Sequence, residues 1–235
     1  MLHLEAFGVP FTIHLADASL APALEPMLPP GSAPAPPGGF ELTLEDLAGL
    51  PELDARLRRH IATHAPGRVF VHAGVVAHHG RAVVLPAATF AGKSELVAAL
   101  VRVGAVYYSD EYAVIDDDGL VHPYARPLTL RARAGRAAER LGAAQLGGRP
   151  GTDALPIGLI AATAFAPSAD WAPEERTPAA GALLLLAHAG QARADPARVL
   201  DALRLAALHA RVLEGPRGEA DATAPALLAA LDTAV

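Results

Sequence analysis

The middle of the chain has the most regular arrangement of apolar residues. The predicted strand over residues 81–85 is continuously apolar after Arg81, which is typical of a strand covered on both faces. Leu96, Val97 and Leu100 then recur at helical spacing and predict a helix over residues 93–103. Further strands are predicted over residues 68–72, 75–77 and 105–109. The order strand, loop, helix, strand predicts a βαβ-type unit.

The pattern before this unit is less regular and contains a proline-rich interruption. Residues 1–28 predict a few strands, and residues 29–39 have the composition of a loop or semi-stiff linker. Two more elements are predicted there, a strand over residues 40–44 and a helix over residues 51–64. We therefore expect a small β-containing N-terminal region, residues 1–65, and a larger domain, residues 66–235.

The pattern after residue 120 predicts further helices and strands. Helices are expected over residues 131–146, 197–213 and 224–231, and strands over residues 156–165 and 182–186. The acidic run at residues 116–119 is explained by a hairpin turn. Strands and helices that mix in this way predict an α/β fold.

Composition excludes several classes of protein. With 52% hydrophobic and 19% charged residues, the chain can bury a sizeable core. The absence of cysteine excludes disulfides and thiolate chemistry, and a net charge of -6 argues against nucleic acid as a partner. No apolar run has the length of a membrane span and no signal region is evident, so we expect a cytoplasmic protein with no membrane partner. The sequence leaves open whether the protein forms a homo-oligomer.

The chain contains one lysine, Lys93, and no asparagine, whereas arginine is frequent. Every other cationic position therefore carries arginine. A compact ammonium suits a small pocket that a rigid guanidinium does not fit. Chance survival of one surface lysine is the simpler alternative, and the neighbours of Lys93 argue against it.

Residues 87–94 match the phosphate-loop pattern G-x-x-x-x-G-K-[ST] except at the first position, where Ala87 replaces glycine. Because a strand leads in and a helix leads out, we expect the loop amides to bind the phosphates of a nucleotide. Lys93 would reach the β- and γ-phosphates, and Ser94 would hold Mg²⁺. The residues predicted to bind nucleotide are Ala88, Thr89, Phe90, Ala91, Gly92, Lys93, Ser94 and Glu95.

Two alternatives follow from this loop. An ordinary strand-to-helix turn can contain Gly-Lys-Ser by accident. If position 87 needs a positive φ, its Cβ costs on the order of 1 kcal/mol, and the chain would then be an accessory protein with a degenerate loop.

Asp110 and Glu111 end the predicted strand that follows the phosphate-loop helix. The carboxyl ends of neighbouring parallel strands meet at one edge of a sheet, so we expect these carboxylates near the loop. Phosphoryl transfer needs such a group to hold Mg²⁺ or to accept the proton of the attacking hydroxyl. We therefore predict Ser94, Asp110 and Glu111 as metal ligands. The alternative is an acidic strand end in solvent.

The chain resembles the HPr kinase/phosphorylase C-terminal domain and its shorter relatives associated with modified-peptide biosynthesis. The resemblance lies in residues 72–76, in Gly92-Lys93-Ser94-Glu95, in residues 104–111 and in residues 121–128. It implies that His72 lies beside the phosphates, that Asp110 is the acid/base, and that Glu111 takes the place of a second aspartate. The catalytic set it implies is His72, Lys93, Asp110 and Glu111.

Other side chains have weaker claims to a function. His72 on an apolar strand is equally well explained as a buried core histidine. His78 and His79 are interpreted as exposed hairpin residues rather than metal ligands, because neither adjacent strand offers a carboxylate at useful spacing. Arg126 is a candidate for the cation that stabilises transferred phosphate.

These patterns together predict an α/β protein with a P-loop domain resembling the HPr kinase fold. The expected activity is ATP- and Mg²⁺-dependent transfer of the γ-phosphoryl group to a hydroxyl, of a peptide or protein serine or a small molecule. The alternatives are a non-catalytic nucleotide- or peptide-binding accessory protein and a nucleotide hydrolase that acts as a switch.

Overall fold

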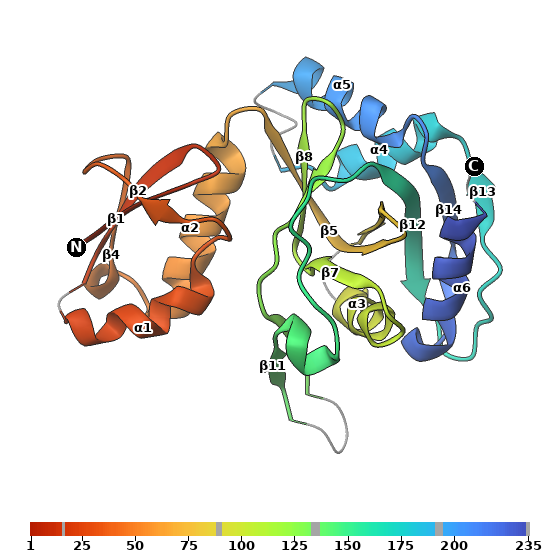
Figure 1. The fold of residues 1–235 in the computed structure, drawn as a ribbon, viewed down its shortest axis with the longest axis horizontal. Coiled ribbons are helices and arrows are strands. Elements are labelled where there is room, and N and C mark those ends of the chain that lie inside the picture. Colours follow the sequence, from red (N-terminus) through yellow and green to blue (C-terminus); the bar gives the residue numbers. More distant parts are fainter. Residues whose placement is uncertain (16, 88–90, 133–136, 191–194, 234–235) are drawn as a thin grey trace. The chain divides into compact units, whose positions relative to one another are not determined.

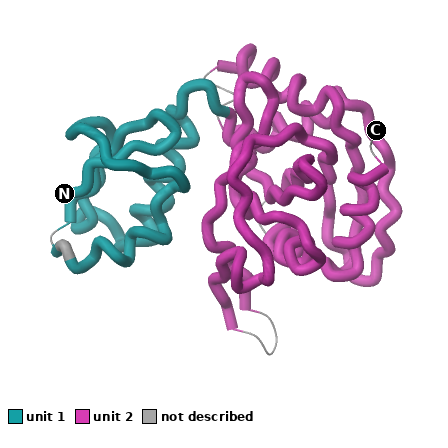
Figure 2. The backbone as a smooth tube through the Cα atoms, viewed as in Figure 1, with its two compact units in different colours: residues 1–68 teal, residues 69–235 magenta. Residues whose placement is uncertain are grey.

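We describe the protein from a computed structural model, which covers the chain except residues 16, 88–90, 133–136, 191–194 and 234–235. The chain divides into two compact units, residues 1–68 and 69–235 (Figure 2). The predicted boundary after residue 65 falls in the short link between helix α2 (Leu50–His64) and strand β5 (Arg68–His78). Helices and strands mix in each unit, which confirms an α/β protein in general terms.

The first unit combines a four-stranded sheet with helices. The sheet order is β3-β1-β2-β4, with β1 (Leu2–Ala6), β2 (Val9–His14), β3 (Ala33–Pro34) and β4 (Phe40–Thr43). A short helix α1 (Ala21–Leu24) lies between β2 and β3 in the sequence. The predicted helical face of α2 is confirmed, since Leu53, Leu57 and Ile61 are all buried. These apolar side chains form the core of the unit with Phe11 and Ile13 of β2.

The second unit is built on one eight-stranded sheet. Its order is β13-β14-β12-β6-β5-β8-β9, and β7 also pairs with β5. The strands after β5 are β6 (Arg81–Pro86), β7 (Val106–Ser109), β8 (Tyr112–Asp116), β9 (Val121–His122), β12 (Ile157–Phe165), β13 (Glu174–Arg176) and β14 (Arg211–Arg217). A separate pair consists of β10 (Leu128–Leu130) and β11 (Glu139–Leu141).

Helices cover both faces of this sheet (Figure 1). On one face lie α3 (Lys93–Arg102) and α6 (Ala220–Asp232), and on the other lie α4 (Pro178–Ala187) and α5 (Pro196–Ala207). Successive residues of β6 enter the two cores: Val83 packs with α3 and α6, and Val84 with α4 and α5. The continuous apolar run of β6 therefore has the structure that it predicts.

The carboxyl ends of four strands meet at one edge of the sheet. Strand β12 is parallel to both β6 and β14. Strands β6 and β7 are each antiparallel to β5, which lies between them, so they run parallel to one another. The predicted βαβ-type unit is therefore present with one strand inserted between its parallel strands. Ligands of open α/β sheets bind at this kind of edge, which makes it the expected location of a binding site.

The predicted strand over residues 182–186 is wrong, since this segment belongs to α4. Thr177 accepts a hydrogen bond from the backbone N–H of Ala180 and caps the helix, and Pro178 occupies its first turn. A short continuously apolar run does not distinguish a buried strand from a buried helix. Neither α4 nor any other helix of the described chain is long and apolar enough to cross a membrane.

Two helix predictions also need correction. The helix expected over residues 197–213 ends at Ala207, and residues 211–217 form β14, which lies between β13 and β12 in the sheet. The helix expected over residues 131–146 is absent among the described residues of that segment, which form β11 and a 3-10 helix over Ala143–Leu146. Pairing of β14 with β12 and β13, and of β11 with β10, overrides the local helical spacing.

Candidate active site

Gly92 connects the loop after β6 to helix α3. Its backbone is left-handed, with φ 76° and ψ 21°, and it precedes the first helical residue, Lys93. A Cβ at this position would lie 2.7 Å from a guanidinium nitrogen of Arg217. Glycine is therefore required here both by the conformation and by the space.

The predicted nucleotide-binding loop is described in part. Ala88, Thr89 and Phe90 lie outside the described residues. The other predicted contacts, Ala91, Gly92, Lys93, Ser94 and Glu95, are half-buried at the beginning of α3. The first backbone N–H groups of a helix have no acceptor within the helix, and such donors favour an anion.

Lys93, Ser94 and Asp110 form a contiguous polar cluster at the carboxyl edge of the sheet. The Lys93 ammonium donates to the backbone carbonyl of Asp110 and lies 3.4 Å from its Oδ1. The Ser94 hydroxyl donates to Oδ2 of Asp110 at 2.6 Å. The structure thus brings together three of the predicted site residues, from α3 and from the residue directly after β7.

Burial raises the pKa of the Asp110 carboxyl, while the charge of Lys93 and the Ser94 hydrogen bond oppose the rise. The side chains of Lys93 and Asp110 are only 9% and 14% exposed. A carboxylate with a raised pKa binds a proton more readily than one in water, which suits a general base. Asp110 is therefore buried and paired, unlike an acidic strand end in solvent.

A glycine in β5 makes room for the lysine. A Cβ on Gly74 would lie 2.5 Å from Val97 Cγ2 and 3.1 Å from Lys93 Cγ. Glycine within a strand is a sequence signal for such a close approach. The close packing of β5 against α3 positions the aliphatic part of the Lys93 side chain.

His72 lies on β5 next to this cluster. Its Nδ1 is 2.9 Å from the carbonyl oxygen of Ala87, and because a carbonyl only accepts, Nδ1 carries the proton. Burial lowers the pKa of His72, and the charge of Lys93 lowers it further. The ring is therefore neutral near pH 7, and its Nε2 is the unprotonated nitrogen. His72 fits both interpretations of the sequence. It is hydrogen-bonded within the fold, as a core histidine is, and it also lies in the electrostatic field of Lys93 and Asp110.

The backbone of Ala87 is not left-handed. Among the described non-glycine residues, positive φ occurs at Phe7, His79 and Ser168, and Ala87 is not one of these. Its methyl group is buried. The cost expected for a Cβ at a left-handed position therefore does not arise at this residue.

Glu111 and Arg126 form an ion pair beside the cluster. The Arg126 guanidinium lies 3.4 Å from Oε2 of Glu111. The hydroxyl of Tyr107 donates to the Arg126 carbonyl at 2.6 Å and ties this segment to β7. Glu111 is thus paired with the arginine predicted to be an additional cation.

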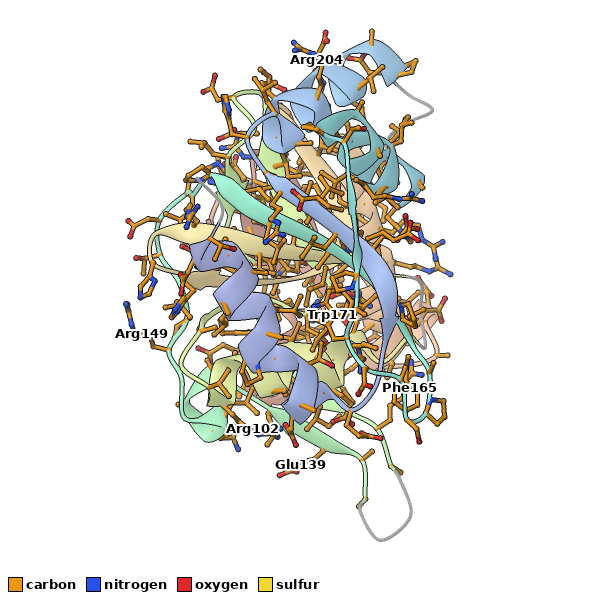
Figure 3. All side chains as sticks on the ribbon, turned by 90° about the vertical axis from the view of Figure 1, so that its right-hand side faces the viewer. Arg102, Glu139, Arg149, Phe165, Trp171 and Arg204 are labelled. Atoms are coloured by element: carbon orange, nitrogen blue, oxygen red, sulfur yellow. The ribbon has the colours of Figure 1, made fainter. Side chains whose placement is uncertain are left out.

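Arg217 is a buried cation that the sequence analysis missed. It ends β14 and is 2% exposed. Its guanidinium donates to the carbonyls of Gly92 and Gly218, each at 2.8 Å, and lies 5.6 Å from the ring centroid of Phe165. Phe165 ends the neighbouring strand β12 (Figure 3). The signal that could have located Arg217 is the apolar pair Val212-Leu213 before Gly-Pro, which fits a strand end better than a helix.

The lowered pKa of His72 predicts a pH-dependent stability. The unfolded chain, with a histidine pKa near 6.5, binds a proton more readily than the folded chain, so stability is lost as the pH falls below about 6.5. We expect the melting temperature to fall less between about pH 7.5 and about pH 5.5 in His72→Gln than in the wild type. The exposed His209 provides the control, His209→Gln. Equal slopes for His72→Gln and the wild type would contradict the assignment.

Arg217 is expected to stabilise the junction between β14 and the start of α3. Arg217→Met removes two buried hydrogen bonds from a charged donor, so the free energy of unfolding in urea should fall by about 1.5–3 kcal/mol. Arg176→Met is the matched control, because its ion pairs with Glu174 and Glu214 are exposed and should change stability by at most about 1 kcal/mol. Similar losses in the two variants would show that Arg217 has no special role.

No protein-family model and no curated protein matches the sequence. The geometry of the site and the chemistry of its residues are therefore the basis for a proposed function.

Proposed function

We propose that the protein is an ATP- and Mg²⁺-dependent kinase that transfers the γ-phosphoryl group to a hydroxyl, preferentially that of a peptide or protein serine. The observation that carries this proposal is the convergence of Lys93 and Ser94, at the start of α3, on Asp110, at the end of β7. A cation, a hydroxyl and a carboxylate at the carboxyl edge of a sheet are the groups that phosphoryl transfer requires. The likeness of residues 72–128 to the HPr kinase/phosphorylase domain supports the same reaction and a P-loop fold.

The residues present suit a nucleotide phosphate and its metal ion. The ammonium of Lys93 and the first N–H groups of α3 provide positive charge and donors for phosphate oxygens. Ser94 Oγ is an oxygen ligand of the kind that Mg²⁺ prefers, and the phosphate oxygens and water would complete the coordination of the ion. When bound, the ion would neutralise charge on the transferred phosphate.

In the chemical step, Asp110 accepts the proton of the acceptor hydroxyl. The acceptor hydroxyl attacks the γ-phosphorus, the bond from that phosphorus to the bridging oxygen breaks, and ADP leaves. Asp110 takes the hydroxyl proton, for which its raised pKa is suitable. Bound phosphate would compete with Asp110 for Lys93 and so release the carboxylate for this task.

Two neighbouring groups support this chemistry. His72 presents a neutral ring, so its Nε2 can accept a hydrogen bond from the incoming hydroxyl or from water. Arg217 holds the carbonyl of Gly92, which fixes the turn from which the helix N–H groups point. We assign Arg217 as a positioning residue, since it acts through Gly92.

A non-catalytic nucleotide-binding accessory protein is the second candidate. The observation that favours it is the direct engagement of Asp110 by both Lys93 and Ser94, which leaves turnover dependent on release of the carboxylate. Ala87 no longer supports this candidate, because its backbone is not left-handed.

Lys93→Met is expected to weaken Mg-ATP binding by about ten- to a hundredfold, because one charged contact with phosphate is worth about 1.5–3 kcal/mol. Calorimetric titration measures the effect. Arg102→Met is the control, since it removes the same charge from the other end of α3, where the side chain is 42% exposed (Figure 3). A Lys93→Met affinity equal to that of the control would exclude a phosphate role for Lys93.

Asp110→Asn separates the two candidate functions. As a general base, Asp110 should contribute at least about a hundredfold to phosphoryl transfer, while Mg-ATP affinity changes little. Transfer to a panel of serine-containing peptides is followed by mass spectrometry, with the exposed Asp118→Asn as control. Equal losses of binding and transfer would make Asp110 a metal-positioning group, with Glu111 as the next candidate base. Wild-type protein that binds Mg-ATP and phosphorylates no acceptor would favour the accessory protein.

A further inference from the structure

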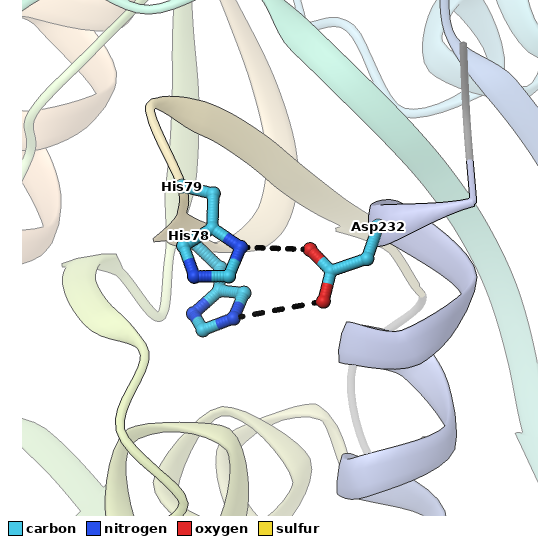
Figure 4. A group of neighbouring side chains, drawn as sticks. All are labelled: His78, His79 and Asp232. Carbon is cyan, nitrogen blue, oxygen red and sulfur yellow. Dashed lines mark hydrogen bonds and ion pairs between the residues drawn. The ribbon is translucent and has the colours of Figure 1, made fainter.

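A second group of ligand-type side chains lies on the hairpin that joins β5 to β6. His78 ends β5, and His79 and Gly80 form the two-residue turn, with φ of 48° and 75°. The carboxylate that faces these rings is Asp232, the last residue of α6 (Figure 4). Neither strand next to His78 and His79 offers a carboxylate at useful spacing. Asp232 is supplied instead by a helix 153 residues further along the chain than His79.

The three side chains are close enough to share one ion. Nδ1 of His79 is 2.9 Å from Oδ1 of Asp232, and Nε2 of His78 is 4.0 Å from Oδ2. The three ligand atoms all lie within 4.8 Å of one another. Ligand atoms around a tetrahedral zinc ion are about 3.3 Å apart, a separation that lies inside this range. Small rotations of partly exposed side chains would complete the geometry.

A further contact joins the hairpin to α6. Arg81, on the same hairpin, donates to the carbonyl of Leu231, in the last turn of that helix, at 2.7 Å. This contact holds the hairpin against the end of α6, so the two histidines and Asp232 face each other across a fixed junction.

We propose that His78, His79 and Asp232 bind a divalent transition-metal ion of the zinc class. Two imidazole nitrogens and one carboxylate are typical zinc ligands, whereas Mg²⁺ and Ca²⁺ prefer oxygen alone. Three protein ligands leave the fourth position to water. The ion clamps the hairpin to the last turn of α6, and the length of β6, about 20 Å, separates it from the candidate active site.

Calorimetric titration of the metal-stripped full chain with zinc chloride tests the proposal. The wild type should bind one ion, and His79→Ala and Asp232→Ala should each weaken binding by at least about a hundredfold, because loss of an outer-shell partner alone costs 10- to 100-fold. His209→Ala, which removes an exposed histidine outside the group, should bind like the wild type. No saturable zinc binding by the wild type, or equal affinity in His79→Ala and His209→Ala, would overturn the site.

Thermal unfolding with and without zinc distinguishes a metal clamp from a simple ion pair. A bound ion should raise the melting temperature of the wild type and leave that of Asp232→Asn unchanged. If Asp232→Asn lowers the melting temperature equally with zinc and with a chelator, the contacts serve only as an ion pair and the proposal is wrong. Asp232 is 43% exposed, so the isosteric change should leave the fold intact.

Discussion

The buried carboxylate of Asp110 determines much of the arrangement around it. A carboxylate with only 14% of its side chain exposed needs a partner, and the chain supplies Lys93 and Ser94 from the start of α3. Removing one partner of a buried ion pair typically costs about 3–5 kcal/mol, because the remaining charge stays buried. The start of α3 and the end of β7 are therefore held together by electrostatics as well as by packing. In our account, phosphate replaces the carboxylate as the partner of Lys93.

The sheet explains why these groups meet. Strand β6 is covered by helices on both faces. The loop that follows it begins at the carboxyl edge of the sheet, where β7 and β14 also end. Arg217 brings β14 into the same site through its bond to the Gly92 carbonyl. The opposite end of β6 carries the His78–His79 turn, which α6 meets with Asp232. One strand thus joins the two candidate sites at its ends.

Local sequence patterns predict the elements that a single stretch of sequence specifies by itself. The spacing of Leu53, Leu57 and Ile61 has one structural interpretation, the helix α2, and the short valine-rich run after Arg81 favours one of two, the strand β6. The apolar segment of α4 has two structural interpretations, strand and helix, and the N-cap residue Thr177 favours the helix. Strand β14 follows a helix without a strong break and exists because β12 and β13 pair with it.

The candidate site was predictable to the extent that it lies in one stretch of sequence. Lys93, Ser94 and Asp110 lie within one strand–loop–helix–strand unit, so strand order alone brings them together. Arg217 and Asp232 come from segments more than a hundred residues away from their partners, Gly92 and His79. Their positions depend on the pairing of β14 and on the packing of α6, which bring together segments far apart in the sequence.

Because Lys93 is the only lysine of the sequence, its side chain can be observed alone. Protein labelled with ¹³C and ¹⁵N only in lysine should give a single side-chain nitrogen signal, that of Nζ, by NMR. If Lys93 exchanges Asp110 for phosphate, saturating Mg-ATP should shift this signal strongly, and Mg²⁺ with adenosine should leave it in place. An unchanged lysine signal in protein shown by calorimetry to be saturated with Mg-ATP would contradict the account.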